Sequence, residues 1–203
     1  MDAERLGWLL DRQDILDCLT RFSRGMDRFD RELVLSAFHP DAVIAAGDFV
    51  GGPADLYDWA SAMHEKGQVA THHNLLNNTC EIDGETAHSE TYYLFVGRNR
   101  DETNWMAGGR YIDRLERCDG VWQIALRTNV IEWSGMVPTL PIPFADVPDM
   151  HGIGTPSRSK GDPSYQRPLL VRRRSGNSPV TEAVSEHTAE KAVDQVGNHV
   201  KRR

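Results

Sequence analysis

The sequence has 203 residues, of which 39% are hydrophobic and 26% are charged, a composition typical of a globular domain that can bury a core. Its formal net charge of −7 argues against a general nucleic-acid binder, because such proteins present a basic face. The charge is unevenly distributed, with ten Lys or Arg against five Asp or Glu in residues 156–203, a balance of +5 that leaves −12 for residues 1–155. This break predicts an acidic body followed by a basic tail.

The three cysteines, Cys18, Cys80 and Cys118, are odd in number, far apart and outside any CxxC pattern. This spacing argues against a disulfide framework or a zinc site and favours a reducing compartment. The N-terminal residues show no basic stretch followed by an apolar run, and no apolar stretch approaches the ~20 residues of a membrane span. We therefore expect a cytoplasmic protein with no membrane or nucleic-acid partner.

The first part of the chain reads mainly as helix. Apolar residues recur at helical spacing over residues 3–24, and further helices are predicted over 31–38 and 53–67. Pro40 is expected to stop the second helix, while Pro53 and Gly67 mark the start and the stop of the third. Between the last two, the apolar run 42–52 closes on glycines and predicts a strand and a turn.

From residue 72 the pattern changes to strands. We predict strands over 72–84, 86–99, 105–120 and 121–133, with Asp-Gly turns closing the first and third of them. Helices followed by a meander of long strands indicate an α+β fold, in which helices cover one face of an antiparallel sheet and enclose a pocket.

After Trp133 the composition changes again. Prolines crowd residues 134–168, which excludes regular helix or central strand there. The sequence predicts a domain over 1–135, a proline-rich arm over 136–160 that covers the pocket or a neighbouring subunit, and a basic tail over 161–203. Disorder is the expected state of that tail, with one weak amphipathic helix at 180–200.

Two polar residues stand out as candidates for acid–base chemistry. Asp27 lies near the end of the first helix, where an ordinary surface acid is the simpler interpretation. His73 lies in a predicted strand, but leucines fall on both sides of that strand, so alternation does not choose its inward face. A histidine that faces a carboxylate is a standard general base, because the carboxylate fixes the imidazole tautomer.

Arg127 lies in the last predicted strand. Its parity there favours a solvent-facing side chain, and the functional alternative is a cation that stabilises an anionic intermediate. The histidines form no HExxH motif or other trusted ligand spacing, and we find no phosphate-binding glycine loop and no nucleophile elbow. The residues therefore predict neither a metal nor a cofactor.

Three segments together resemble the SnoaL-like branch of the nuclear-transport-factor-2 superfamily: "RFSRGMDRFDRELVLSAFHPDAV", "THHNLLNNTCEIDGETAHSE" and "GGRYIDRLERCDGVWQIALR". That branch includes scytalone dehydratase, bile-acid 7α-dehydratase and hexachlorocyclohexane dehydrochlorinase, and the resemblance covers about residues 5–135. It implies a cone-shaped curved sheet, an α+β barrel, with the N-terminal helices packed on its concave face.

The resemblance also implies roles for residues of this chain. The family's helix-end Asp falls on Asp27, its strand His on His73, with His72 as the alternative one position away, and its arginine on Arg127. Where relatives carry a Tyr or Lys that assists the leaving group, this chain has Phe22, which cannot donate a proton. The substitutes considered for that acid are Tyr57, Tyr92, Tyr93, Tyr111 and Asn74.

The predicted function is a cofactor-independent lyase in aromatic compound catabolism. His73 takes a proton, Asp27 orients His73, and Arg127 stabilises the anion, with loss of water or carbon–carbon cleavage that releases a small aldehyde. The alternatives are a ketosteroid-type isomerase and a non-catalytic binding module. A small aromatic or polycyclic hydroxylated substrate and a homodimer or homotrimer are expected. The predicted substrate-binding residues are Phe22, Asn74, Tyr57, Trp59 and Tyr111.

Overall fold

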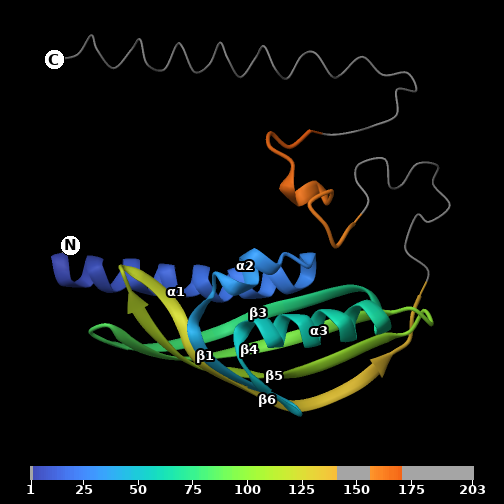
Figure 1. Ribbon diagram of the computed structural model, residues 1–203, viewed down its shortest axis with the longest axis horizontal. Coiled ribbons are helices and arrows are strands. Elements are labelled where there is room, and N and C mark those ends of the chain that lie inside the picture. Colours follow the sequence, from blue (N-terminus) through green and yellow to red (C-terminus); the bar gives the residue numbers. More distant parts are fainter. Residues whose placement is uncertain (1, 141–155, 171–203) are drawn as a thin grey trace, which may run out of the picture.

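The computed structural model describes residues 2–140 and 156–170, and three α-helices cover one face of its sheet (Figure 1). These helices are α1 (Ala3–Arg28), α2 (Arg31–Leu35) and α3 (Pro53–Gly67). The Asp2 carboxylate caps α1 by accepting the Glu4 N–H at 3.0 Å. At the other end Phe29 adopts a left-handed conformation with φ of 52°, and its N–H bonds to the carbonyls of the last turn. The first helix therefore runs one turn beyond the predicted 3–24.

Six strands form one curved sheet in the order β2-β1-β6-β5-β4-β3. Their bounds are β1 Phe38–Ala46, β2 Phe49–Gly51, β3 Gln68–Asp83, β4 Thr86–Asn99, β5 Asn104–Cys118 and β6 Val121–Val137. All neighbouring pairs are antiparallel except β1 and β6, which are parallel. The predicted α+β class and the curved sheet under N-terminal helices are confirmed. The sheet is mixed rather than purely antiparallel, and it stays open, with β2 and β3 at its edges.

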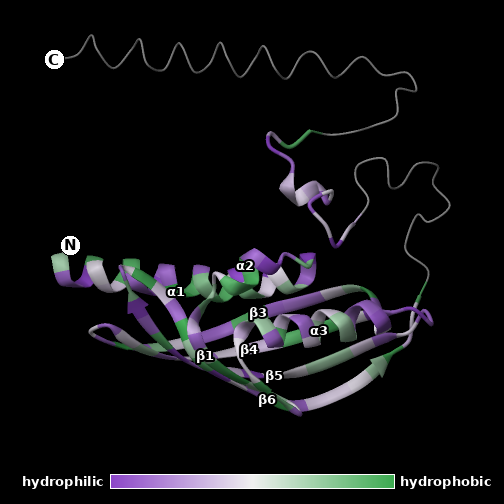
Figure 2. Ribbon diagram, in the orientation of Figure 1, coloured by the Kyte–Doolittle hydropathy of each residue, from purple (hydrophilic) through white to green (hydrophobic). Residues whose placement is uncertain are grey.

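The core lies between α1 and the concave face of the sheet. Ile15, Leu19, Phe22 and Met26 recur every three or four residues along α1, and all are buried. They belong to one apolar cluster with strand residues such as Trp122. Figure 2 shows hydrophobic and hydrophilic residues alternating along α1, as expected of a helix that buries one side. Burial of such large apolar side chains stabilises the fold by roughly 1.5–3 kcal/mol each.

The second predicted helix is shorter than expected. It ends at Leu35, and Phe38 already begins β1, which continues through Pro40. The pairing of β1 with β6 is interrupted between Phe38 and Val43, so Pro40, which has no N–H to donate, lies in the irregular part of the ladder.

An irregularity in β3 explains why leucines occur at positions of both parities along this strand. The pairing of β3 with β4 shifts register between Leu75 and Asn78, and the buried parity changes there. Leu75 faces inward before the shift and Asn78 faces inward after it, whereas Leu76 is 55% exposed. Alternation therefore holds from Thr71 to Leu75 and from Asn78 to Asp83, but not across the shift.

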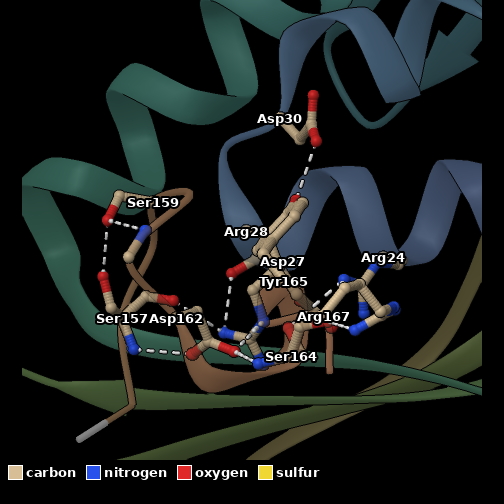
Figure 3. A network of polar contacts seen from close by, with 11 residues as sticks. Arg24, Asp27, Arg28, Asp30, Ser157, Ser159, Asp162, Ser164, Tyr165 and Arg167 are labelled. Atoms are coloured by element: carbon tan, nitrogen blue, oxygen red, sulfur yellow. Dashed lines mark hydrogen bonds and ion pairs between the residues drawn. The ribbon is translucent and has the colours of Figure 1, made fainter. Parts of the chain in front are cut away.

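Residues 156–170, which span the end of the predicted arm and the start of the predicted flexible tail, dock against the helices (Figure 3). This docked segment includes the short 3-10 helix η2 (Pro163–Tyr165). Asp30 at the start of α2 accepts hydrogen bonds from Lys160 and, at 2.7 Å, from the Tyr165 hydroxyl. The Arg158 guanidinium donates to the carbonyls of His64 and Gln68 at 3.1 and 2.8 Å. The last predicted strand is longer than expected, because β6 continues to Val137, into residues where we expected no central strand. Residues 141–155 and 171–203, with the helix expected at 180–200, lie outside the described residues.

Candidate active site

The last turn of α1 brings Asp27 against His73 of β3. The Asp27 Oδ1 lies 2.6 Å from His73 Nδ1, and Asp27 Oδ2 accepts the backbone N–H of His73 at 2.9 Å. Ser23, one turn earlier on α1, donates its hydroxyl to the His73 carbonyl. The side chains of His73 and Asp27 are only 8% and 14% exposed. Two residues distant in the sequence are thus held in one rigid contact.

This contact fixes the imidazole tautomer of His73. A carboxylate can only accept, so Nδ1 carries the proton and Nε2 keeps its lone pair. His73 also lines a cavity between the helices and the sheet. An oriented imidazole whose Nε2 has no hydrogen-bond partner among the described residues, beside a cavity, has the geometry of a general base. His72, the alternative one position away, is exposed.

The cavity has a volume of about 280 Å³ between the helices and the sheet. Apolar side chains form most of its wall, including Met26, Ile44, Phe95, Trp105 and Ala107. A few polar groups interrupt that wall, namely Asp48, His64, His73, Tyr93, Tyr111, Arg127 and Asn129. A mainly apolar cavity with few polar groups is typical of a site for a small organic molecule.

Arg127 lines this cavity but is not the free cation that the resemblance implies. Its Nε and Nη2 donate to the two carboxylate oxygens of Asp113, both at 2.7 Å. The two residues are only 2% and 1% exposed, so the prediction of a solvent-facing side chain is wrong. Among the described residues Nη1 has no hydrogen-bond partner. Asp113 neutralises the charge of Arg127, and Nη1 is the nitrogen left for a bound molecule.

Phe22 has a structural role that its sequence context did not reveal. The Arg127 guanidinium lies 4.3 Å from the ring centre of Phe22 and 4.3 Å from that of Tyr111. An aromatic face stabilises a desolvated cation electrostatically. Phe22 therefore supports the buried arginine at a position where the relatives carry a proton donor.

The predicted substrate-binding residues divide into two groups. Phe22, Trp59 and Tyr111 line the cavity. Tyr57 does not, because its hydroxyl turns to the Phe29 carbonyl at 2.9 Å. Asn74 does not either, because it follows the inward-facing His73 on the strand and is exposed, with its amide bonded to the Leu94 carbonyl at 3.0 Å.

Two tyrosines remain as hydrogen-bond donors at the cavity. Tyr93 and Tyr111 both line it, with their rings stacked at 4.5 Å between centres, whereas Tyr92 is 43% exposed. Burial raises the pKa of both phenols, most strongly for Tyr111. Their hydroxyls therefore stay protonated and can donate hydrogen bonds to an anion without releasing the proton.

His64 is a cavity residue that was not predicted from the sequence. It is 5% exposed and shares a buried stripe of α3 with Leu56 and Ala60. The spacing of four residues between these positions was the available signal, because it places His64 on the apolar face of the helix. Burial lowers the pKa of His64 to about 4, so its ring is neutral at neutral pH.

Within residues 2–140 and 156–170, no three His, Cys, Asp or Glu side chains gather as they would to hold a metal ion. No helix in the same part of the chain is long and apolar enough to cross a membrane.

Comparisons with known proteins identify the family of the domain. The sequence model of the SnoaL-like domain matches residues 8–128. None of the curated proteins matches the sequence. A solved structure of hexachlorocyclohexane dehydrochlorinase from Novosphingobium barchaimii is 18% identical, with a TM-score of 0.62 over 68% of this chain and 97% of the other.

Two further solved structures have similar identities and TM-scores to this chain. A putative scytalone dehydratase from Novosphingobium aromaticivorans is 18% identical, with a TM-score of 0.57 over 65% of this chain and 91% of the other. A protein of unknown function from Mycobacterium tuberculosis is 21% identical, with a TM-score of 0.56 over 61% of this chain and 77% of the other. At these identities the likeness shows a shared fold.

Proposed function

The chain belongs to the SnoaL-like domain family, and on this basis we propose that it is a cofactor-independent lyase whose general base is His73. The observation that carries the proposal is the 2.6 Å contact between His73 Nδ1 and Asp27 Oδ1 at the wall of an apolar cavity. The names of two similar structures, a dehydrochlorinase and a putative scytalone dehydratase, support chemistry in which a proton and a leaving group depart.

The proposed reaction begins when His73 Nε2 takes a proton from a substrate carbon or hydroxyl. The electron pair of the broken bond forms a new double bond, and the leaving group departs with its own pair. Asp27 stabilises the imidazolium that results, and an oriented base of this kind contributes about 10²–10⁴-fold in rate. The hydroxyls of Tyr93 and Tyr111 and the Nη1 of Arg127 are the donors available to the anion that forms.

In dehydration the leaving group is hydroxide, which takes up a proton to become water. In carbon–carbon cleavage the deprotonated hydroxyl becomes the carbonyl of a small aldehyde, and the other fragment leaves with the electron pair of the carbon–carbon bond and takes up the proton held by His73. Phe22 supplies no proton to a departing hydroxide, and burial keeps the pKa of Tyr111 high. Both observations favour cleavage that releases an aldehyde, because that reaction needs no strong acid at the position of Phe22.

The size of the cavity restricts the substrate. A cavity of ~150 Å³ holds one benzene ring. The volume of about 280 Å³ found here therefore suits a molecule of one or two rings better than a steroid. Aromatic side chains such as Phe95 and Trp105 in the wall favour an aromatic or flat hydroxylated substrate.

A ketosteroid-type isomerase is the second candidate, and the two buried phenols favour it. Tyr93 and Tyr111 would donate hydrogen bonds to an enolate while His73 returns the proton to a neighbouring carbon. No leaving group is required in that reaction, so Phe22 presents no difficulty.

Proton exchange separates these candidates from a binding module. The chain is incubated in deuterated water with a panel of small hydroxylated aromatic and alicyclic compounds, and products are followed by mass spectrometry. Loss of a fragment supports the lyase, deuterium uptake without loss supports the isomerase, and binding without either supports the binding module.

Two variants test the general base. His73→Gln and Asp27→Asn should each slow turnover by about 10²–10⁴-fold, because the first removes the base and the second favours the wrong tautomer. The control is His72→Gln, which changes the exposed neighbouring histidine and should leave turnover unchanged. Full turnover in His73→Gln would refute the proposal.

A further inference from the structure

A second imidazole faces the same cavity as His73. The ring of His64 lies edge-on to His73 at 5.7 Å between centres and stacks on Phe95 at 5.3 Å. His64 comes from the last turns of α3, whereas His73 comes from β3, so two separate elements bring the rings together. The proposed proton transfer does not use His64, which leaves its role to be explained.

A chain of hydrogen bonds of defined direction ends on His64. The Asp101 carboxylate accepts the hydroxyl of Thr103 at 2.6 Å, and the Thr103 oxygen accepts from Asn99 Nδ2 at 2.9 Å. Gln68 Nε2 then donates to Asn99 Oδ1 at 3.1 Å, and Gln68 Oε1 lies 3.0 Å from His64 Nδ1. Because a carboxylate cannot donate, each link can run in only one direction, and His64 Nδ1 must be the donor.

The remaining nitrogen of His64 is therefore an acceptor. With the proton on Nδ1 and burial holding the pKa of the ring at about 4, Nε2 carries a lone pair at neutral pH. Arg158 further disfavours a second proton because it repels a positive charge, whereas the hydrogen bond to Gln68 and the charge of Asp27 have the opposite effect. Among the residues that the structure describes, none forms a hydrogen bond to Nε2.

We propose that His64 is a substrate-binding residue whose Nε2 accepts a hydrogen bond from a hydroxyl or N–H group on a ring held beside His73. The cavity then presents two acceptor nitrogens, beside the side-chain oxygens of Asp48 and Asn129, in a mainly apolar wall, so it selects hydroxylated rings over halogenated rings of the same size. This deepens the proposed function by naming the substrate class. The reaction at His73 depends on the proposed function, but the binding preference set by His64 does not.

Desolvation is the physical origin of this selectivity. A ring without a donor fills the cavity equally well but buries the lone pair of His64 Nε2 without a partner. Sites that present buried polar groups reject analogues that cannot pair with them, more strongly than apolar sites reject a change of size. One hydrogen bond of this kind corresponds to a preference of about tenfold in Kd.

The first test reads the tautomer directly in the wild-type chain. A long-range ¹H–¹⁵N correlation spectrum at pH 7 should show a protonated Nδ1 and an unprotonated Nε2 for His64, and the signal is assigned by its loss in His64→Asn. A protonated Nε2, or a ring with both nitrogens protonated at pH 7, would overturn the inference. This measurement requires neither a substrate nor catalysis.

The second test measures selectivity with phenol and fluorobenzene, two single rings of similar size. In His64→Asn the Asn amide can still donate toward Gln68 but nothing replaces Nε2, so the preference for phenol should fall about tenfold. The matched control is His72→Asn, an exposed histidine on β3, which should keep the wild-type preference. An unchanged preference in His64→Asn, or no saturable binding of phenol by the wild type, would overturn the inference.

A third variant separates this inference from the proposed function. His73→Asn should lose turnover while the phenol preference that depends on His64 persists. If turnover depends on His73 but selectivity is the same in His64→Asn, the proposed function survives and this inference fails. If selectivity depends on His64 and no variant affects turnover, this inference survives and the proposed function fails.

Discussion

Asp113→Asn should destabilise the fold strongly, because it leaves the charge of Arg127 buried without a counter-ion. Arg127 and Asp113 are 2% and 1% exposed and share two hydrogen bonds of 2.7 Å. The loss of one partner from a buried pair costs about 3–5 kcal/mol. In a domain of this size each kcal/mol shifts Tm by roughly 2–4 °C, so the expected fall in Tm is roughly 6–20 °C.

The measurement is equilibrium unfolding in urea, with the slope of the transition compared between variants. Glu132→Gln is the matched control, because Glu132 also accepts an arginine hydrogen bond of 2.7 Å, from Arg110, but the side chains are 39% and 29% exposed. Its cost should be about 0–1 kcal/mol. The reasoning fails if Asp113→Asn costs no more than the control. A double change to apolar residues, Arg127→Met with Asp113→Leu, should recover much of the lost stability.

Three further outcomes are expected. Gly25→Ala should lower the free energy of unfolding by more than about 1 kcal/mol, because the new Cβ would lie 2.6 and 2.8 Å from atoms of α2. Gly7→Ala has open space around the new Cβ and should raise the free energy of unfolding by about 0.5–1 kcal/mol. Urea unfolding measures both changes, and equal effects would contradict the packing argument. Because burial lowers the pKa of His64 to about 4, the unfolded chain binds the extra proton first, and the wild type should lose up to about 3 kcal/mol of stability as the pH falls from about 6.5 to 4. His64→Asn should lack this part of the pH dependence, and identical profiles would refute it. Tyr165→Phe removes the 2.7 Å hydrogen bond to Asp30 and should weaken docking of residues 156–170 by about 1–2 kcal/mol, seen as faster tryptic cleavage there; an unchanged rate would contradict the anchoring role.

The order of elements was predictable, and a boundary was predicted correctly where it has a local cause. Pro53 and Gly67 bound α3 as expected, and the Asp-Gly pair at 83–84 closes the hairpin between β3 and β4. The contact between Asp27 and His73 was expected from the family resemblance, because strand alternation alone could not choose the inward face of β3. The register shift between Leu75 and Asn78 is the physical reason.

The partner of Arg127 shows where sequence reasoning ends. Cys118 pairs with Val121 across the turn, and counting outward from that pair places Asp113 opposite Leu126. The register shift after Arg114 moves Asp113 opposite Arg127 instead. A shift of one residue decides whether the carboxylate reaches the guanidinium, and no local pattern in the sequence specifies it.

The edge position of β3 gives the contact between Asp27 and His73 a second consequence. Ser23 and Asp27, four residues apart on α1, occupy the carbonyl and the N–H of His73, groups that a seventh strand would otherwise use. Side chains of α1 thus make the backbone hydrogen bonds that a neighbouring strand would make at this point, and they block edge-to-edge association with another chain there. Selection for solubility and selection for proton transfer would then act on the same aspartate, and a substitution that releases it would promote aggregation as well as inactivity.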